Sequence, residues 1–169
     1  PISISAVNDL PVLDLNGAAS GTGSSALYVG GFGAVALAPA AALSDVDSDT
    51  LAEITARIAT NGATKDVLLL NQAAASAAKS IGATVDWSDT TKTLKISGGS
   101  LTLDAAQKII NGVAFVSSDP NATGSRTVEI SIKDGANSPL VTQTASLTLT
   151  QTPYTATPTP DKSYVLTLT

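Results

Sequence analysis

The sequence contains no cysteine, no histidine and no methionine among its 169 residues, and aromatic residues make up only 4% of it. Without His or Cys the chain excludes Ser-His-Asp triads, thiol nucleophiles and the usual Cys/His zinc sites. Without Cys it also excludes a disulfide framework. The fold must therefore be held by an aliphatic core, and carboxylates are the main groups left for chemistry.

Charged residues are also scarce, and acidic residues outnumber basic ones. Charged residues make up 14% of the chain, the net charge is -5 and the pI is about 4.4. Nucleic-acid binding requires a basic patch that displaces counterions from phosphates, so we predict no nucleic-acid partner. The sequence has no run of about 18 apolar residues, which predicts no membrane span. The 43% of hydrophobic residues argues against an intrinsically disordered chain.

Short runs that alternate between apolar and small polar residues dominate the chain, and this period of two is typical of strands with one buried face. Many short strands separated by turn-rich loops predict an all-β sandwich. The predicted strands are Val12–Leu15, Val35–Ala38, Leu51–Ala59, Val67–Leu70, Gly82–Trp87, Thr93–Ser97, Val113–Ser117, Arg126–Lys133 and Val141–Thr150.

One short helix is predicted near residues 103–110. Thr102 or Asp104 can cap its start, and Gly112 follows its end. The Ala-rich segment Asn71–Ser80 has good helix propensity, but it lacks large apolar residues that would form a packing face. We therefore count a single helix.

We predict three parts in the chain: a terminal strand and linker (1–9), a sandwich (10–150) and a Pro/Thr-rich spacer with a second terminal strand (151–169). The segment Leu166–Thr169 repeats Leu147–Thr150 letter for letter, and Ile2–Ser5 is a conservative version of it. This repetition fits the last strand of a repeated module. Chance recurrence of Thr/Leu strands explains it equally well.

The acidic residues are 12 Asp and only 2 Glu. Asp is common in turns and is a hard oxygen ligand, so this bias indicates many turns or a calcium site. Asp45, Asp47 and Asp49 alternate in the loop between two predicted strands. An EF-hand loop is excluded, because Thr50 and Ala56 stand where its Gly and Glu are required.

The predicted topology brings distant acidic residues to one pole. If the strands around Asp45 are B and C of an immunoglobulin-like sandwich and the last two are F and G, the B–C and F–G loops share one end with the chain entrance. That end gathers Asn8 and Asp9 at the entrance, Asp45 and Asp47 in the B–C loop, and Asp134 in the F–G loop. Close carboxylates repel one another unless a cation lies among them. Otherwise each is a solvated turn former.

Three segments carry a resemblance to a known family. Ala6–Pro11 resembles the interdomain linker of cadherins and bacterial cadherin-like repeats, in which Asn-Asp is followed two residues later by Pro. Leu43–Ser48 resembles the family's Asp-x-Asp loop, and Ile132–Gly135 resembles its Asp-Gly loop. The resemblance implies an immunoglobulin/cadherin-like Greek-key β-sandwich with Ca2+ as its cofactor. It implies calcium ligands at Asn8, Asp9, Asp45, Asp47 and Asp134.

The chain also departs from this family. Where members usually carry an early Glu it has Val29, Gly30 and Gly31, and its exit segment Gln151–Tyr154 lacks a carboxylate. We therefore expect calcium only at the N-terminal pole. The resemblance implies a repeat of a bacterial extracellular or cell-surface adhesin, whose partners are tandem domains or neighbouring copies and whose ligand is a cell surface or a glycan.

Two other functions compete with this non-catalytic module. In the first, Ile2–Ser5 or Tyr164–Thr169 adds to the sheet edge of a neighbouring copy and builds an extracellular fibre. In the second, the chain is a carbohydrate-binding module, although the expected position of Trp87 is in the core rather than on an aromatic platform. We expect no enzyme, because Glu53 and Glu129 sit on alternating strands and face solvent.

Overall fold

The computed structural model describes residues 8–135, 138–151, 154–158 and 164–168, and it describes side chains only up to residue 151. The described chain is mostly β, as predicted, and carries two helices. The elements are β1 (Val12–Asp14), β2 (Ser24–Val29), β3 (Val35–Ala36), β4 (Ala42–Ser44), β5 (Glu53–Thr60), β6 (Asp66–Leu70), α1 (Gln72–Ser80), β7 (Thr84–Ser88), β8 (Thr93–Ser97), α2 (Leu103–Asn111), β9 (Val113–Ser117), β10 (Gly124–Lys133), β11 (Val141–Thr150), β12 (Tyr154–Pro158) and β13 (Tyr164–Leu168).

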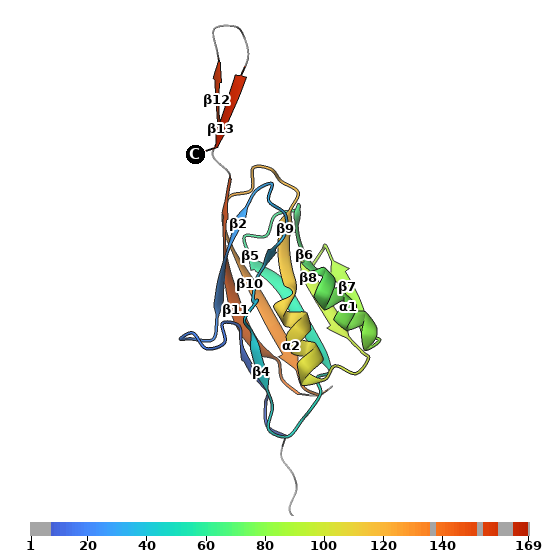
Figure 1. The fold of residues 1–169 in the computed structure, drawn as a ribbon. Helices are drawn as coiled ribbons and strands as arrows, with labels where there is room; N and C mark the ends of the chain where they lie inside the picture. Colours follow the sequence, from blue (N-terminus) through green and yellow to red (C-terminus); the bar gives the residue numbers. More distant parts are fainter. Residues whose placement is uncertain (1–7, 136–137, 152–153, 159–163, 169) are drawn as a thin grey trace, which may run out of the picture.

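Two sheets form the body of the molecule (Figure 1). The larger sheet has the strand order β2-β11-β10-β5-β8-β7, and the smaller one has the order β3-β9-β6. Neighbouring strands are antiparallel except for β2 and β11, which run parallel. A short pair, β1 with β4, lies at one end, where Val12 pairs with Ser44.

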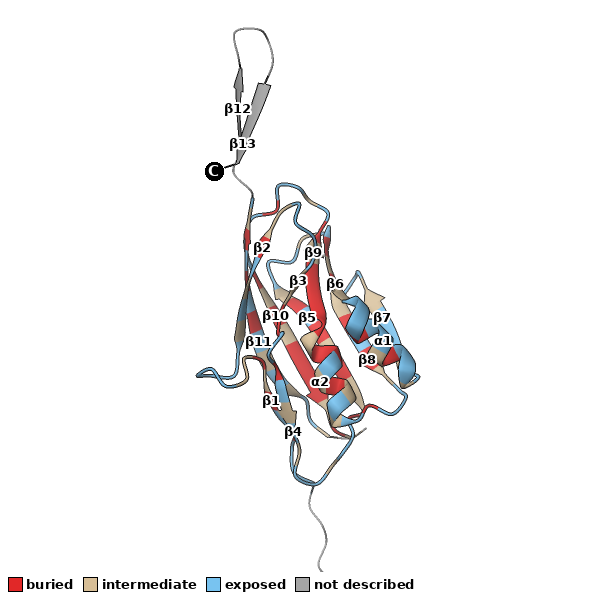
Figure 2. Cartoon of the chain, in the orientation of Figure 1, coloured by how far each residue is buried: buried red, intermediate tan, exposed pale blue. Residues whose placement is uncertain are grey.

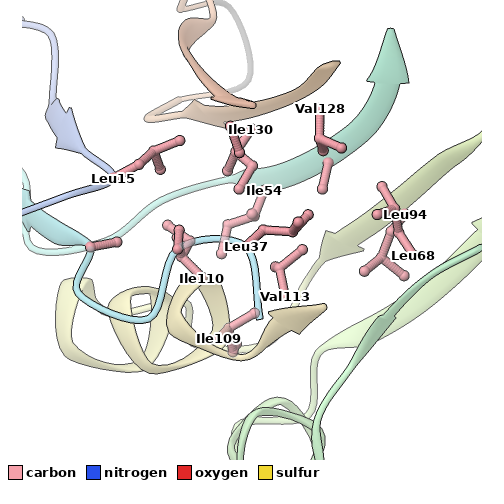
Figure 3. Packing of buried hydrophobic residues seen from close by; sticks show 14 of the residues in the cluster. Leu15, Leu37, Ile54, Leu68, Leu94, Ile109, Ile110, Val113, Val128 and Ile130 are labelled. Carbon is pink, nitrogen blue, oxygen red and sulfur yellow. The ribbon is translucent and has the colours of Figure 1, made fainter. Parts of the chain in front are cut away.

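The core lies between the two sheets and under α2. Figure 2 shows buried residues along the inner faces of the strands and on one side of α2, with exposed residues on the opposite faces. This pattern follows from the alternation of the strands, as in β10, where Val128, Ile130 and Ile132 are all fully buried. Figure 3 shows Ile109 and Ile110 of α2 near Ile54 and Leu37 in this core. The core is aliphatic, as the composition requires.

The predicted helix near 103–110 is confirmed as α2. The Thr102 hydroxyl accepts a hydrogen bond from the Ala105 N–H at 3.3 Å, and Gly112 caps the other end. Ala106, Ile109 and Ile110 are spaced to lie on one face of the helix, and all three are buried.

The prediction of a single helix was wrong, because Gln72–Ser80 forms α1. Asn71 caps it through a hydrogen bond from the Ala74 N–H to the Asn71 side-chain oxygen at 2.9 Å. Its packing face consists of the small residues Ala74 and Ala78, which are both buried. Ala74 allows a close approach to Gly112, where an added Cβ would lie 2.3 Å from that of Ala74. Large apolar residues are therefore not needed for this contact.

All nine predicted strands occur, and three of them have the predicted bounds, namely Thr93–Ser97, Val113–Ser117 and Val141–Thr150. The prediction missed β2, whose glycine-rich flanks resemble a loop, and also β4 and β12. Of the two predicted terminal strands, Ile2–Ser5 lies outside the described residues. The other is β13, which pairs with β12 from Tyr154↔Leu168 to Pro158↔Tyr164.

Candidate metal-binding pole

The chain entrance contacts the loop between β4 and β5 directly. The main-chain N–H of Asp9 donates a hydrogen bond to Oδ2 of Asp47 at 2.9 Å, across 38 residues of sequence. The pairing of β1 with β4 produces this contact, because Val12 opposite Ser44 sets the preceding residues beside the loop that follows. The structure thus brings together two of the five predicted ligands.

The same loop folds back on Asp45. The main-chain N–H of Asp47 donates to Oδ1 of Asp45 at 3.2 Å, while Oδ2 of Asp45 is buried and has no hydrogen-bond partner in the described chain. The far end of the loop is fixed to the start of α2, because the Leu103 N–H donates to the Asp49 carbonyl at 3.0 Å. Two anchors therefore hold the loop that carries Asp45 and Asp47.

Asp134 follows the last residue of β10 and is buried, with only 7% of its surface exposed. Its Oδ2 has no hydrogen-bond partner among the described residues. The Lys133 carbonyl before it accepts a hydrogen bond from the Ala52 N–H at 2.8 Å, which places Asp134 beside the start of β5. The start of β5 and the end of β10 are at the lower end of Figure 1, where the β4–β5 loop also lies.

The carboxylates share a pole but do not form a closed cluster. Within residues that the structure describes, no three acidic side chains are grouped closely enough to hold a metal ion. Asn8 donates its side-chain N–H to the Asp9 carbonyl at 2.7 Å and is exposed, as are Asp9 and Asp47. The arrangement offers two orphaned carboxylate oxygens on separate loops, those of Asp45 and Asp134, and a hydrogen bond from the Asp9 N–H to the Asp47 carboxylate.

Asp66 and Arg126 form a buried ion pair that the sequence did not predict. Oδ2 of Asp66 accepts hydrogen bonds from Arg126 Nε at 2.6 Å and from the Ala63 N–H at 2.8 Å. Arg126 also donates to the carbonyls of Thr123 and Ser125. Asp66 precedes an apolar run and resembles a strand-start turn residue, so its position gave no sign of a distant partner. The Asp66–Arg126 pair joins the two sheets, and its two members are among the few buried charged residues.

Trp87 is partly buried and packs against the core cluster, and it also lines a groove beside β6. Lys92 Nζ lies 6.0 Å from the centre of its ring. The two glutamates that we expected to face solvent are partly buried and lie in ion pairs, Glu53 with Lys95 and Glu129 with Arg57.

Comparison with family models finds no match to the chain, and comparison with curated proteins finds no similar sequence. Neither helix in the described part of the chain has the length and hydrophobicity needed to cross a membrane.

Proposed function

We propose that the chain is a calcium-binding, non-catalytic structural or adhesive module of an extracellular or cell-surface protein built from tandem domains. The observation that carries the proposal is the hydrogen bond from the Asp9 N–H to Asp47 Oδ2, which joins the chain entrance to the Asp-x-Asp loop. In such a module a cation at this pole stiffens the junction with the preceding domain.

Two orphaned oxygens support calcium as the cation. Asp45 Oδ2 and Asp134 Oδ2 are buried without a hydrogen-bond partner in the described chain, and such groups are destabilising unless something pairs with them. Carboxylates are ligands that Ca2+ prefers, and Ca2+ takes about 6–8 oxygens. Asn8, Asp9 and Asp47 would supply further oxygens. Water, main-chain carbonyls or a neighbouring domain would complete the set.

The strand order supports an immunoglobulin-like Greek-key assignment. With β3 as strand B, β5 as C, β10 as F and β11 as G, the large sheet contains the order G-F-C. The small sheet then reads B-E-D, with β9 as E and β6 as D, which is the grouping of strands in immunoglobulin-like sandwiches. The hairpin β7–β8 is an addition that widens the large sheet beyond C.

A thermal melt of the full chain in excess calcium and in chelator tests the proposal. A ligand at a hundredfold excess over its Kd stabilises the folded state by about 2.7 kcal/mol. For a chain of this size each kcal/mol raises Tm by about 2–4 °C, so we expect an increase of about 5–10 °C. Magnesium should produce less, because it demands near-ideal octahedral geometry.

The double substitution Asp45→Ala with Asp47→Ala should abolish the calcium-dependent increase in Tm. Each variant is compared with itself in chelator, because the loop also loses the hydrogen bonds that these carboxylates accept. Asp86→Ala is the matched control, since Asp86 is exposed on β7. No calcium shift in the unaltered chain, or an undiminished shift in the double variant, would contradict the proposal.

A further inference from the structure

An apolar groove opens on the side of the molecule where the two sheets end. Its volume is about 680 Å3, and it runs between β6 of the small sheet and β7 of the large sheet, beside α1. Leu68 and Leu94 are almost fully buried at its base and lie close together in Figure 3. Val85 and Trp87 of β7 form the opposite wall, and Lys79 is the one charged residue of the lining.

One wall of the groove is a free strand edge. β6 ends the order β3-β9-β6, so its ladder with β9 uses one edge only. Four consecutive residues of β6, Val67–Leu70, line the groove. No hydrogen bond of the described chain reaches the other edge of these four residues. A free edge with apolar side chains is a template for another strand.

The chain carries a strand of matching length and chemistry. β13 has five residues, as does β6. Its sequence Tyr164–Leu168 is uncharged and mostly apolar, and the period of two in a strand puts Tyr164, Leu166 and Leu168 on one side. Among the described strands, β12 and β13 pair only with each other. Figure 1 places this hairpin beyond the end of β11. A two-stranded hairpin alone is marginally stable in water, so β13 gains from a further partner.

We propose that the groove accepts β13 of a second copy, which adds as a strand to the free edge of β6. The alternate residues Tyr164, Leu166 and Leu168 then enter the groove above Leu68 and Leu94. The hairpin and the groove are different surfaces, so the contact is heterologous and repeats from copy to copy into an open filament. The proposal goes beyond the calcium module and does not depend on it.

Cysteine cross-linking between full-length copies tests the contact, because the chain has no native Cys. A Val85→Cys copy is mixed with a mass-tagged Leu166→Cys copy in chelator and oxidised. A disulfide requires Cα atoms within about 7 Å, so only docked strands cross-link. The matched control is Leu27→Cys on β2, the strand at the opposite edge of the same sheet. Leu27 is 56% exposed, against 42% for Val85. We expect at least about tenfold more mixed dimer with Val85→Cys.

A peptide of residues 161–169 should compete and remove the mixed dimer, whereas the same peptide with Leu166→Lys should not. Trp87 is the only tryptophan and lines the groove, so its fluorescence should change with the first peptide and not with the second. Equal cross-linking by Leu27→Cys, or no effect of the first peptide, would overturn the proposal. A fluorescence change caused by palmitate but not by the peptide would also overturn it, because the groove would then take an acyl chain.

Discussion

Arg126 and Asp66 form an ion pair that is buried on both sides, with Nε and Oδ2 2.6 Å apart and the two side chains 8% and 0% exposed. Arg126 belongs to β10 of the large sheet, and Asp66 belongs to β6 of the small sheet. The pair therefore connects the two sheets at the end away from the candidate metal-binding pole. Its members are 60 residues apart in sequence.

The substitution Arg126→Met should destabilise the chain by about 3–5 kcal/mol, because it leaves the Asp66 carboxylate buried without its cation. Urea unfolding measures this loss. Arg57→Met is the matched control, since the Arg57–Glu129 pair is 49% and 37% exposed and such surface pairs contribute about 0–1 kcal/mol. Adding Asp66→Asn to Arg126→Met should recover part of the stability. A loss no larger than that of Arg57→Met would show that the pair does not hold the sheets together.

Tyr28 and Ser117 make a second link between the sheets. The Tyr28 hydroxyl donates to the Ser117 carbonyl at 2.9 Å and accepts from its N–H at 3.3 Å, while the ring lies edge-on to Phe115. Tyr28→Phe keeps the ring and leaves the two main-chain groups unpaired, which should cost about 1–3 kcal/mol in urea unfolding. Leu27→Ala, on the exposed face of the same strand, should change stability by less than about 0.5 kcal/mol. Equal effects of the two substitutions would contradict this role.

Alternation in the sequence was sufficient to predict the strands whose inner residues are large, such as Val128, Ile130 and Ile132. It failed for β2, because Ser24, Ser25 and Ala26 give little contrast and the strand is defined by its parallel pairing with β11. The sequence pattern also failed to predict α1, because a packing face made of alanines does not stand out as hydrophobic. This face can be recognised only from the structure, in which Gly112 lies against it.

The candidate site was predictable in one respect. The contact between Asp9 and Asp47 follows from an entrance beside the β4–β5 loop, which the order of motifs predicts. The burial of Asp134 was not predictable, because an Asp before Gly is most often a solvated turn residue. The groove beside β6 required knowledge of which strands end their sheets, and periodicity within a strand says nothing about its neighbours.

Gly112→Ala should destabilise the chain by about 1–3 kcal/mol through overpacking. The added methyl group would lie 2.3 Å from Ala74 Cβ and 2.6 Å from the Asn71 Oδ1 that caps α1. Backbone strain is not involved, since φ of Gly112 is -102°. Gly135→Ala is the control, because its nearest neighbour is the Ser138 hydroxyl at 3.3 Å. Thermal melts compare the two. An equal Tm for both would mean that α1 shifts freely away from the end of α2.

Asp134→Asn should have opposite effects on stability in chelator and in calcium. In chelator the substitution replaces a buried carboxylate, whose Oδ2 has no partner in the described chain, with a neutral amide of the same shape. Removing a poorly compensated buried charge should raise stability by about 1 kcal/mol or more. In calcium the same substitution removes one of the proposed anionic ligands, so the calcium-dependent increase in Tm should fall. Thermal melts of the full chain in both conditions measure the two effects together.

The crossing of the two effects separates a metal ligand from a structural residue. If the Asp134 carboxylate stabilised the fold through a contact of its own, Asp134→Asn would lower Tm equally in chelator and in calcium. If the charge of Asp134 had no effect on stability or on calcium binding, neither Tm would change, as expected for the control Asp86→Asn on the exposed face of β7. Only a carboxylate kept buried for a cation gives a higher Tm without calcium and a smaller gain with it. Asp134 is therefore the single position at the candidate metal-binding pole whose substitution best tests calcium binding.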